Sequence, residues 1–261
     1  GILIAFALVL LAQTAVAARG HGTAAALALL ARVMGLTNKA RVESRLHEAF
    51  AEDEERAAAE RLFDPALLAR YAAEVAGQPA SARGTTHISV VDAQGNIAAL
   101  SISNGEGCGY ILPGTGIMMN NMLGEEDLNP HGFQAWPEGC RMSSMMAPTV
   151  AYRADGSVAA FGSGGSNRIR TAILQVLLNM IDFDLTIAEA VEAPRLHFES
   201  GELNLEGGFR PGVAAALRDR RVVTWPRHNL FFGGVHAVLR DAEGRLDAAG
   251  DPRRGGTAAV V

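Results

Sequence analysis

The chain has 261 residues with a formal net charge of −5, and 49% of the residues are hydrophobic and 20% charged. These values are ordinary for a globular protein with one large domain or two small ones. The negative charge and the lack of a basic stripe argue against nucleic acid as a partner. Cys108 and Cys140 are too few for a disulfide framework, and no Cys/His spacing indicates a zinc site.

The chain opens with an apolar run over residues 2–17. No positively charged segment precedes this run, as a signal peptide requires, and the run is shorter than the roughly 20 residues that span a bilayer. Gln13 and Thr14 also interrupt it, so we favour a buried helix over a signal peptide or a membrane helix. Because the first residue is Gly1 and not methionine, we expect the chain to be part of a longer translation product.

The next helix is predicted from its end signals. Thr23 is a typical N-cap for the Ala- and Leu-rich run 24–34, and Gly35 is a typical stop. Beyond this helix the composition predicts a solvated charged helix, a further helix and a linker, at 41–61, 66–76 and 77–84 respectively. The linker would be accessible to a chain break.

After Gly84 the pattern changes to short strands around turn residues, with amphipathic helices between them. We expect strands at 86–91, 97–103, 149–153, 157–161, 233–240 and 245–249, paired as three hairpins, and helices at 168–182 and 187–191. Thr186 and Glu189 have the spacing of a capping box before the second helix. The order indicates helices layered on mainly antiparallel sheet.

Thr85 stands at the beginning of the first predicted strand. Inside an intact chain, a threonine there is an ordinary β-branched strand residue. If the Gly84–Thr85 bond is cut, the freed α-amine, with a pKa near ~8, can act as the general base for the Thr85 hydroxyl. Thr85 is therefore a candidate nucleophile, and His87 shares its face of the strand.

A glycine-rich segment over 161–168, Phe-Gly-Ser-Gly-Gly-Ser-Asn-Arg, joins a predicted strand to a predicted helix. Such a junction can present backbone N–H groups to an oxyanion, and a plain tight turn is the alternative. The segment lacks the lysine of a phosphate loop and the spacing of the dinucleotide fingerprint, which disfavours nucleotide binding. Upstream, Ser143 and Ser144 form a hydroxyl pair that can hold a carboxylate or merely satisfy their own loop.

Four segments of the chain resemble, in order and spacing, the γ-glutamyltranspeptidase family of N-terminal nucleophile hydrolases. They are 85–92, 116–121, 143–145 and 162–166. The resemblance is strong over about residues 85–200 and weaker from there to the end, which includes the Asp-Pro-Arg at 251–253. Residues 1–84 look like the last part of the family's large subunit, and residues 85–261 look like its whole small subunit.

The resemblance implies an α+β fold, a four-layer αββα sandwich, and autocatalytic cleavage between Gly84 and Thr85. It implies that Thr85 attacks a γ-glutamyl amide such as glutathione, giving an acyl-enzyme that passes to water or to an amino-acid acceptor. The two subunits of such a precursor stay associated, with no metal, cofactor or nucleic acid. A periplasmic or extracellular location is expected from the family alone, since residues 1–261 show no export signal.

The resemblance also assigns roles to individual positions. The hydroxyl that supports the nucleophile falls on Ser103, and the two N–H groups of the oxyanion hole fall on Gly165 and Ser166. The pair that binds the substrate α-carboxylate falls on Ser143 and Ser144. The carboxylate-clamping arginine of relatives lies upstream of Gly1.

The positions that hold the substrate amino group depart from the family pattern. The expected asparagine falls on Gly105, with the neighbouring Asn104 as its candidate replacement. The next amino contact falls on Met122, and the acidic partner is Glu125 rather than aspartate. A missing polar partner for an ammonium group costs on the order of 1–3 kcal/mol.

The glycine loop departs from the family's usual Gly-Ser-Pro-Gly-Gly-Ser as well. Gly164 replaces the proline, and Ser166 replaces the last glycine. The backbone donors survive these changes if the loop keeps its shape, although Gly164 makes it less rigid.

Three interpretations follow for the whole protein. The first is a γ-glutamyltransferase or glutathione hydrolase-like enzyme. The second is an N-terminal nucleophile amidase for another acyl group, as in a cephalosporin acylase, which the less polar Gly105 and Met122 favour. The third is a non-enzymatic relative whose precursor is never cleaved.

Overall fold

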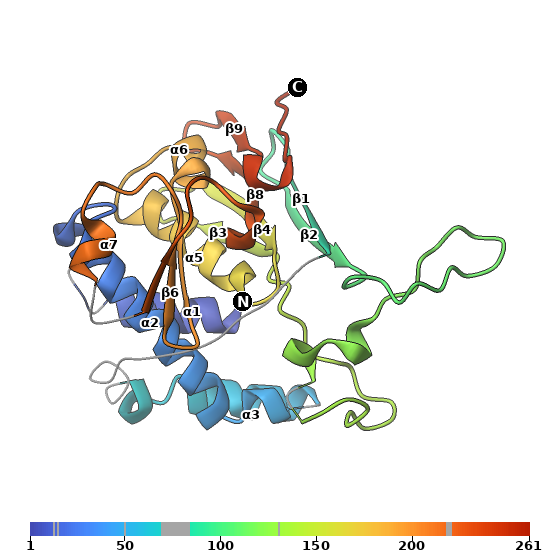
Figure 1. The fold of residues 1–261 in the computed structure, drawn as a ribbon. Coiled ribbons are helices and arrows are strands. Elements are labelled where there is room, and N and C mark those ends of the chain that lie inside the picture. The colour runs from blue at the N-terminus through green and yellow to red at the C-terminus, as the bar shows by residue number, and fades with distance from the viewer. Residues whose placement is uncertain (13, 15, 50, 69–83, 130, 218–220) are drawn as a thin grey trace.

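The computed structural model describes residues 1–261 except 13, 15, 50, 69–83, 130 and 218–220 (Figure 1). The described helices are α1 (Ile2–Ala12), α2 (Ala24–Glu43), α3 (Glu52–Leu62), α5 (Arg168–Ile181), α6 (Ile187–Glu192) and α7 (Val213–Ala216). The strands are β1 (Thr85–Val91), β2 (Ile97–Ser103), β3 (Thr149–Tyr152), β4 (Val158–Gly164), β5 (Leu196–Glu199), β6 (Glu202–Leu205), β7 (Arg221–Thr224), β8 (Gly234–Arg240) and β9 (Leu246–Ala249). Among the described helices, none has the length and apolar character needed to cross a membrane.

The strands form three sheets. An antiparallel sheet has the order β3-β4-β8-β9, and β1 and β2 form a separate antiparallel hairpin. The third sheet has the order β5-β6-β7, in which β6 and β7 run parallel.

The four-stranded sheet lies between helices and the hairpin. Helices α5 and α6 contact β4, β8 and β9 on one face, and the β1–β2 hairpin contacts β4 and β8 (Figure 1). Every residue of β4 is buried, as expected for a central strand with both faces covered. Phe161 of β4, Ile173 of α5 and Val235 of β8 belong to the core between sheet and helices. The described residues thus supply a helix layer and both sheet layers of the expected sandwich.

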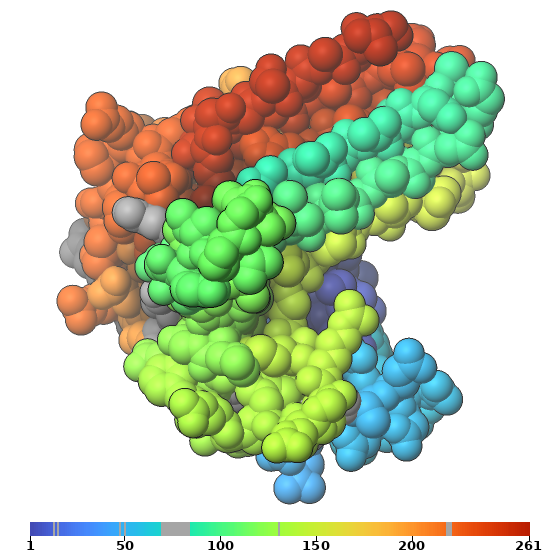
Figure 2. Space-filling view, turned by 90° about the vertical axis from the view of Figure 1, so that its right-hand side faces the viewer, coloured from blue at the N-terminus to red at the C-terminus, as the bar shows by residue number. Residues whose placement is uncertain are grey.

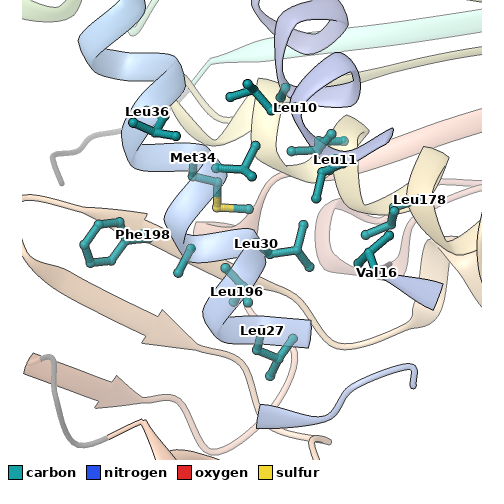
Figure 3. Packing of buried hydrophobic residues seen from close by; sticks show 14 of the residues in the cluster. Leu10, Leu11, Val16, Leu27, Leu30, Met34, Leu36, Leu178, Leu196 and Phe198 are labelled. Carbon is teal, nitrogen blue, oxygen red and sulfur yellow. The ribbon is translucent and has the colours of Figure 1, made fainter. Parts of the chain in front are cut away.

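A second core joins the N-terminal helices to the other side of α5 (Figure 3). Leu10 of α1 and Leu30 of α2 pack in one cluster with Leu178 of α5 and Leu196 of β5. The predicted buried helix at the start of the chain is confirmed, since α1 buries Ile4, Phe6, Ala7, Leu10 and Leu11. It ends at Ala12, before the polar interruption.

Thr23 caps α2 as predicted, because its Oγ1 accepts a hydrogen bond from Ala26 N at 3.2 Å. The predicted stop at Gly35 is wrong, since α2 continues to Glu43. Gly35 is itself buried, and Leu36 and Ala40 beyond it are buried against the second core. The packing of this extra length outweighs the intrinsic cost of one glycine inside a helix, which is about 1 kcal/mol.

The charged helix, the three hairpins, α5 and α6 occur where the pattern predicts them, with ends shifted by a few residues at most except for the charged helix, which begins at Glu52 rather than 41. Residues 65–68 begin a helix, and the rest of the helix predicted over 66–76 and most of the predicted linker lie outside the described residues. One further difference matters for function: β4 runs on through Gly162 and Gly164, so the glycine-rich segment is mostly strand rather than turn.

The face of the hairpin that points away from β4 is apolar. Ile88 and Val90 of β1 lie beside Leu100 and Ile102 of β2, and each of these side chains is about half exposed. The chain that follows β2 extends outward as a long arm before it returns to the body of the molecule (Figure 1).

Candidate active site

Thr85 and Ser103 are cross-strand partners at the open end of the β1–β2 hairpin. The Thr85 hydroxyl donates to Ser103 Oγ at 3.2 Å, and Ser103 Oγ donates to the Gly84 carbonyl oxygen at 3.1 Å. The Gly105 N–H donates to the same Ser103 oxygen at 3.0 Å. Ser103 therefore bridges the hydroxyl of Thr85 and the carbonyl group of the peptide bond that precedes it.

Two glycines of β4 allow the hairpin to approach closely. A Cβ added at Gly164 would lie 2.6 Å from the Thr85 carbonyl oxygen, and one added at Gly162 would lie 2.2 Å from His87 Nδ1. Both distances are far below a normal contact, so the close packing of β1 on β4 requires residues without side chains. Thr85 is thereby held directly over the strand that leads into Gly165 and Ser166.

His87 lies on the Thr85 face of the strand, as predicted, and is buried against β4. Its Nδ1 is 2.7 Å from Ser101 Oγ, and its Nε2 is 2.7 Å from Ser89 Oγ. Burial, with a smaller contribution from the charge of His236, lowers the pKa of His87 to about 4. The imidazole is therefore neutral near pH 7 and links the two strands of the hairpin.

The loop after β4 has the backbone of an anion site. Gly165 has φ +128° and Ser166 has φ +52°, an uncommon value for a residue with a side chain. In the described part of the chain, neither the Gly165 N–H nor the Ser166 N–H donates a hydrogen bond. These two amides precede α5, where the helix dipole also favours negative charge.

Asp127 fixes this loop from the side. Its carboxylate accepts from Ser166 Oγ at 2.7 Å and from Asn167 Nδ2 at 3.1 Å. Burial raises the pKa of Asp127, and the hydrogen bond from Ser166 opposes that shift. Asp127 is not among the predicted site residues, although it lies two residues beyond Glu125, the predicted acidic partner.

Glu125 lies next to the segment that follows the β1–β2 hairpin. A Cβ added at Gly105, where φ is +66°, would lie 2.1 Å from Glu125 Oε1 and 2.0 Å from Asn121 Oδ1. Oxygen atoms of these two side chains thus occupy the space beside residue 105, which explains why a glycine stands there. Glu125 Oε1 is buried without a hydrogen-bond partner among the described residues, and burial, with the charges of Asp127 and Glu106, raises the pKa of Glu125.

Ser143 and Ser144 line a separate part of the same region. Both are exposed, and both border a cavity of about 490 Å³ that also reaches Ser166 and Asn167. Ser144 Oγ accepts from Met146 N at 3.1 Å, which is the kind of hydrogen bond expected if this serine only stabilises its own loop. Asn104 is exposed, and its carbonyl oxygen accepts from Asn121 N at 3.2 Å.

The geometry therefore brings together Thr85, Ser103, Gly165, Ser166 and Glu125, with Asp127 and Asn121 added to the predicted set. Asn121 lies in the segment 116–121, which resembles the family, but the resemblance assigns it no role. Asp127 contacts the loop after β4, and Asn121 lies beside Gly105. Only the folded structure reveals these contacts, since 39 positions separate Asp127 from Ser166 in the sequence.

The α+β sandwich with a hairpin that begins at Thr85 is the fold of the N-terminal nucleophile hydrolases. The solved cephalosporin acylase from Bacillus halodurans shares it over 99% of this chain and 49% of its own, with a TM-score of 0.77 at 21% identity. The family model for gamma-glutamyltranspeptidase matches residues 1–261. The chain belongs to the γ-glutamyltranspeptidase family.

Some of its curated relatives are named as acylases and others as glutathione hydrolases. The acylase ACY 1 proenzyme of Pseudomonas sp. (strain SE83) is 36% identical over 181 residues, which are 68% of this chain and 32% of that protein. The glutathione hydrolase proenzyme of Escherichia coli (strain K12) is 31% identical over 189 residues, 67% of this chain and 32% of that protein. The chain thus spans about a third of the length of these relatives.

Proposed function

We propose that the protein is an autoprocessed N-terminal nucleophile enzyme of γ-glutamyltransferase or glutathione hydrolase type, with Thr85 as nucleophile. The observation that carries the proposal is the Ser103 hydroxyl, which bridges the Thr85 hydroxyl and the Gly84 carbonyl oxygen. Self-cleavage needs a hydrogen-bond donor at the carbonyl oxygen of the bond that is cut, and the Ser103 hydroxyl lies there, beside the Thr85 hydroxyl.

Cleavage begins when Thr85 Oγ1 attacks the Gly84 carbonyl carbon. The hydroxyl proton passes to the Thr85 nitrogen as the peptide C–N bond breaks, which leaves an ester between Gly84 and the Thr85 side chain. Ser103 donates to the carbonyl oxygen as negative charge develops on it. Water then hydrolyses the ester and frees the Thr85 α-amine beside its own hydroxyl.

In the mature enzyme the α-amine takes the hydroxyl proton while Thr85 Oγ1 attacks the γ-carbonyl of the donor. The Gly165 and Ser166 N–H groups stabilise the oxyanion, and the leaving amine takes a proton as it departs. Water or an amino-acid acceptor then attacks the acyl-enzyme and returns free Thr85.

The donor's charged groups have matching partners. Glu125, with its unpaired buried oxygen, compensates the substrate ammonium, and Ser143 and Ser144 bind the α-carboxylate. Asn104 lies beside the same segment and is the weaker candidate for an amino contact, since its side chain is exposed. Glu125 thus offsets part of the polar contact to the substrate amino group that is lost because Gly105 and Met122 stand at the other two positions.

Residues 1–84 and 85–261 remain together as parts of two subunits after cleavage. The packing of α1 and α2 against α5 and β5 supports this association, because the second core would be exposed if they separated.

The test is intact mass and N-terminal sequencing of the complete gene product, beside a Thr85→Ala variant. We expect a new terminus at Thr85 in the first protein and an uncut chain in the second. A folded, soluble wild-type protein that stays uncut would leave the non-enzymatic interpretation in its place.

A second candidate function is an amidase for an acyl group without an α-amino group. The similarity to an acylase proenzyme and the apolar Met122 favour it. A pair of anilides, γ-glutamyl and glutaryl, differs only in the amino group. A glutathione hydrolase prefers the γ-glutamyl anilide, whereas a glutaryl preference would reverse the order of the two candidates.

A further inference from the structure

Arg254 lies at the end of a short helical turn after β9, Pro252–Arg254, and the proposed reaction steps do not involve it. Figure 2 shows the red C-terminal chain lying along the teal chain of the β1–β2 hairpin, which begins at Thr85. The Arg254 N–H donates to the Asp251 carbonyl oxygen at 3.3 Å, and its Nη2 donates to the Leu230 carbonyl oxygen at 3.4 Å. The half-buried residue is therefore held both at its backbone and at its guanidinium group.

Three glycines make room for this side chain. A Cβ added at Gly234 of β8 would lie 2.6 Å from Arg254 Cδ, so the aliphatic part of the side chain packs directly on the backbone of that strand. A Cβ added at Gly164 would lie 3.3 Å from Arg254 Nη1, and one added at Gly165 would lie 3.3 Å from Nη2. The guanidinium group therefore lies against the end of β4 and the first residue of the proposed oxyanion loop.

The guanidinium group is also close to Thr85. The Cβ added at Gly164, which would lie 3.3 Å from Arg254 Nη1, would lie 3.2 Å from Thr85 Cβ as well. Arg254 Nη1 and the Thr85 side chain thus approach the same point beside β4. Charges at such short range interact strongly where the site is partly shielded from water.

We propose that Arg254 is a positioning residue whose positive charge keeps the Thr85 α-amine of the cleaved enzyme in its neutral form. This rests on the proposed function, because the amine exists only after cleavage at Gly84. Only the neutral amine can take the hydroxyl proton, and a positive charge nearby disfavours the ammonium form. The same charge favours the oxyanion that develops beside the Gly165 amide.

The other cationic and titratable groups around Arg254 come from neighbouring elements. Burial lowers the pKa of His236 in β8, and the charge of Arg254 adds to this effect while Asp251 opposes it. Burial also lowers the pKa of Arg168 in α5, and Arg254 again adds to the shift. His87 of β1 is neutral near pH 7, since burial lowers its pKa to about 4. The charge of Arg254 thus reaches groups on two elements next to β4.

Four carboxylates also face this region, and they are Glu106, Glu125, Asp127 and Asp251. Asp127 accepts from Ser166 Oγ at 2.7 Å, and Asp251 pairs with Arg195 at 2.7 Å, so both have partners of their own. All four are present in the wild type and in every variant below. A difference between those proteins in pH dependence therefore reports the charge at position 254.

The test is the pH dependence of kcat/KM for the complete, processed protein, with whichever of the γ-glutamyl and glutaryl anilides it prefers. We expect the acid limb of Arg254→Met to lie about one pH unit above that of the wild type, because loss of the cation raises the pKa of the amine. Below the limb, this is about a tenfold loss of activity. Arg254→Lys keeps the charge and is expected to keep the limb near its wild-type position.

Arg221→Met is the matched control, since it removes an exposed arginine of β7 and the same unit of charge. An acid limb that is unmoved in Arg254→Met, or that moves equally in Arg221→Met, overturns the proposal. A limb that moves equally in Arg254→Met and Arg254→Lys overturns it as well, because the shape of the side chain and not its charge would then matter.

A second measurement needs only the wild type and holds even if the variants do not fold. Competitive acetylation over a range of pH, read by mass spectrometry of the new N-terminal peptide, gives the pKa of the Thr85 α-amine. We expect a value about one unit below the ordinary ~8 of an α-amine, and a value of ~8 or above overturns the proposal. The same spectra report cleavage at Gly84. An uncut wild type overturns the proposed function and this inference with it, whereas a cut protein with an ordinary amine overturns the inference alone.

Discussion

At the scale of single residues, two features define the candidate site. The buried Glu125 Oε1 has no hydrogen-bond partner among the described residues, and the Ser103 hydroxyl links Thr85 to the Gly84 carbonyl oxygen. Ser103 accepts from Thr85 and from the Gly105 N–H, and donates to the Gly84 carbonyl. One hydroxyl thus contacts both the proposed nucleophile and the carbonyl oxygen of the bond at which we propose cleavage. Loss of this hydroxyl leaves both groups without their shared partner.

We therefore predict that Ser103→Ala slows self-cleavage of the complete precursor on the order of 10²-fold, the usual effect of removing one donor to a developing oxyanion. Ser103→Thr keeps the hydroxyl and is expected to cleave at close to the wild-type rate. The measurement is the fraction of cut chain against time after synthesis. If Ser103→Ala and Ser103→Thr are slowed equally, the hydroxyl is not what matters at this position.

At the scale of elements, the position of Thr85 follows from the fit between the β1–β2 hairpin and the glycines of β4. His87 sits where a Gly162 side chain would be, and Thr85 sits over Gly164. Hydroxyls of both strands hold the His87 ring, so the hairpin meets β4 as one unit. A shift of this hairpin moves Thr85 relative to the Gly165–Ser166 amides.

Gly162→Ala is expected to displace the hairpin, because the new methyl group would overlap the His87 ring. Overpacking of this kind costs about 1–3 kcal/mol of stability. We also expect slower cleavage at Gly84, as small displacements of reacting groups reduce rates strongly. Gly124→Ala is the control, since nothing lies within 4 Å of its added Cβ. Urea midpoints and cleavage rates that are the same for the two variants would contradict the proposed fit.

The sequence allowed the prediction of the hairpins, α5, α6 and the order of the family's segments, because these depend on local pattern and turn residues. It did not allow the prediction of β5, β6 and β7, which are only four residues long. The runs of β5 and β6 are also mostly buried and carry little periodicity. The role of Asp127 was also out of reach, since its partners Ser166 and Asn167 are brought to it only by the fold. The extension of α2 beyond Gly35 has the same origin in long-range packing.

At the scale of the whole molecule, a buried ionic network ties the C-terminal segment to the sheets. Asp251 pairs with Arg195 at 2.7 Å and with Arg253 at 3.2 Å, and Arg253 pairs with Glu206 at 2.6 Å. Asp251 also accepts from the Val235 N–H of β8 at 2.8 Å. These side chains are almost wholly buried, so the residues after β9, the end of β6 and the segment before β5 are held by groups that depend on one another.

Asp251→Asn is expected to destabilise the protein by about 3–5 kcal/mol, because it leaves the buried charge of Arg195 without its partner. Asp241→Asn removes an exposed ion pair with Arg245 and should change stability little.

Burial alone would raise the pKa of Asp251, but Arg195 and Arg253 outweigh it and hold the pKa below its usual value. The unfolded chain therefore takes up the proton first as the pH falls, so the stability that Asp251 contributes is complete above about pH 4. It is lost as the pH falls through the depressed pKa of the folded state. Urea unfolding from pH 7 down to pH 3 should show the gap between the wild type and Asp251→Asn narrowing only at the acid end. A gap that is constant with pH would mean that the ionised carboxylate is not what stabilises the folded chain.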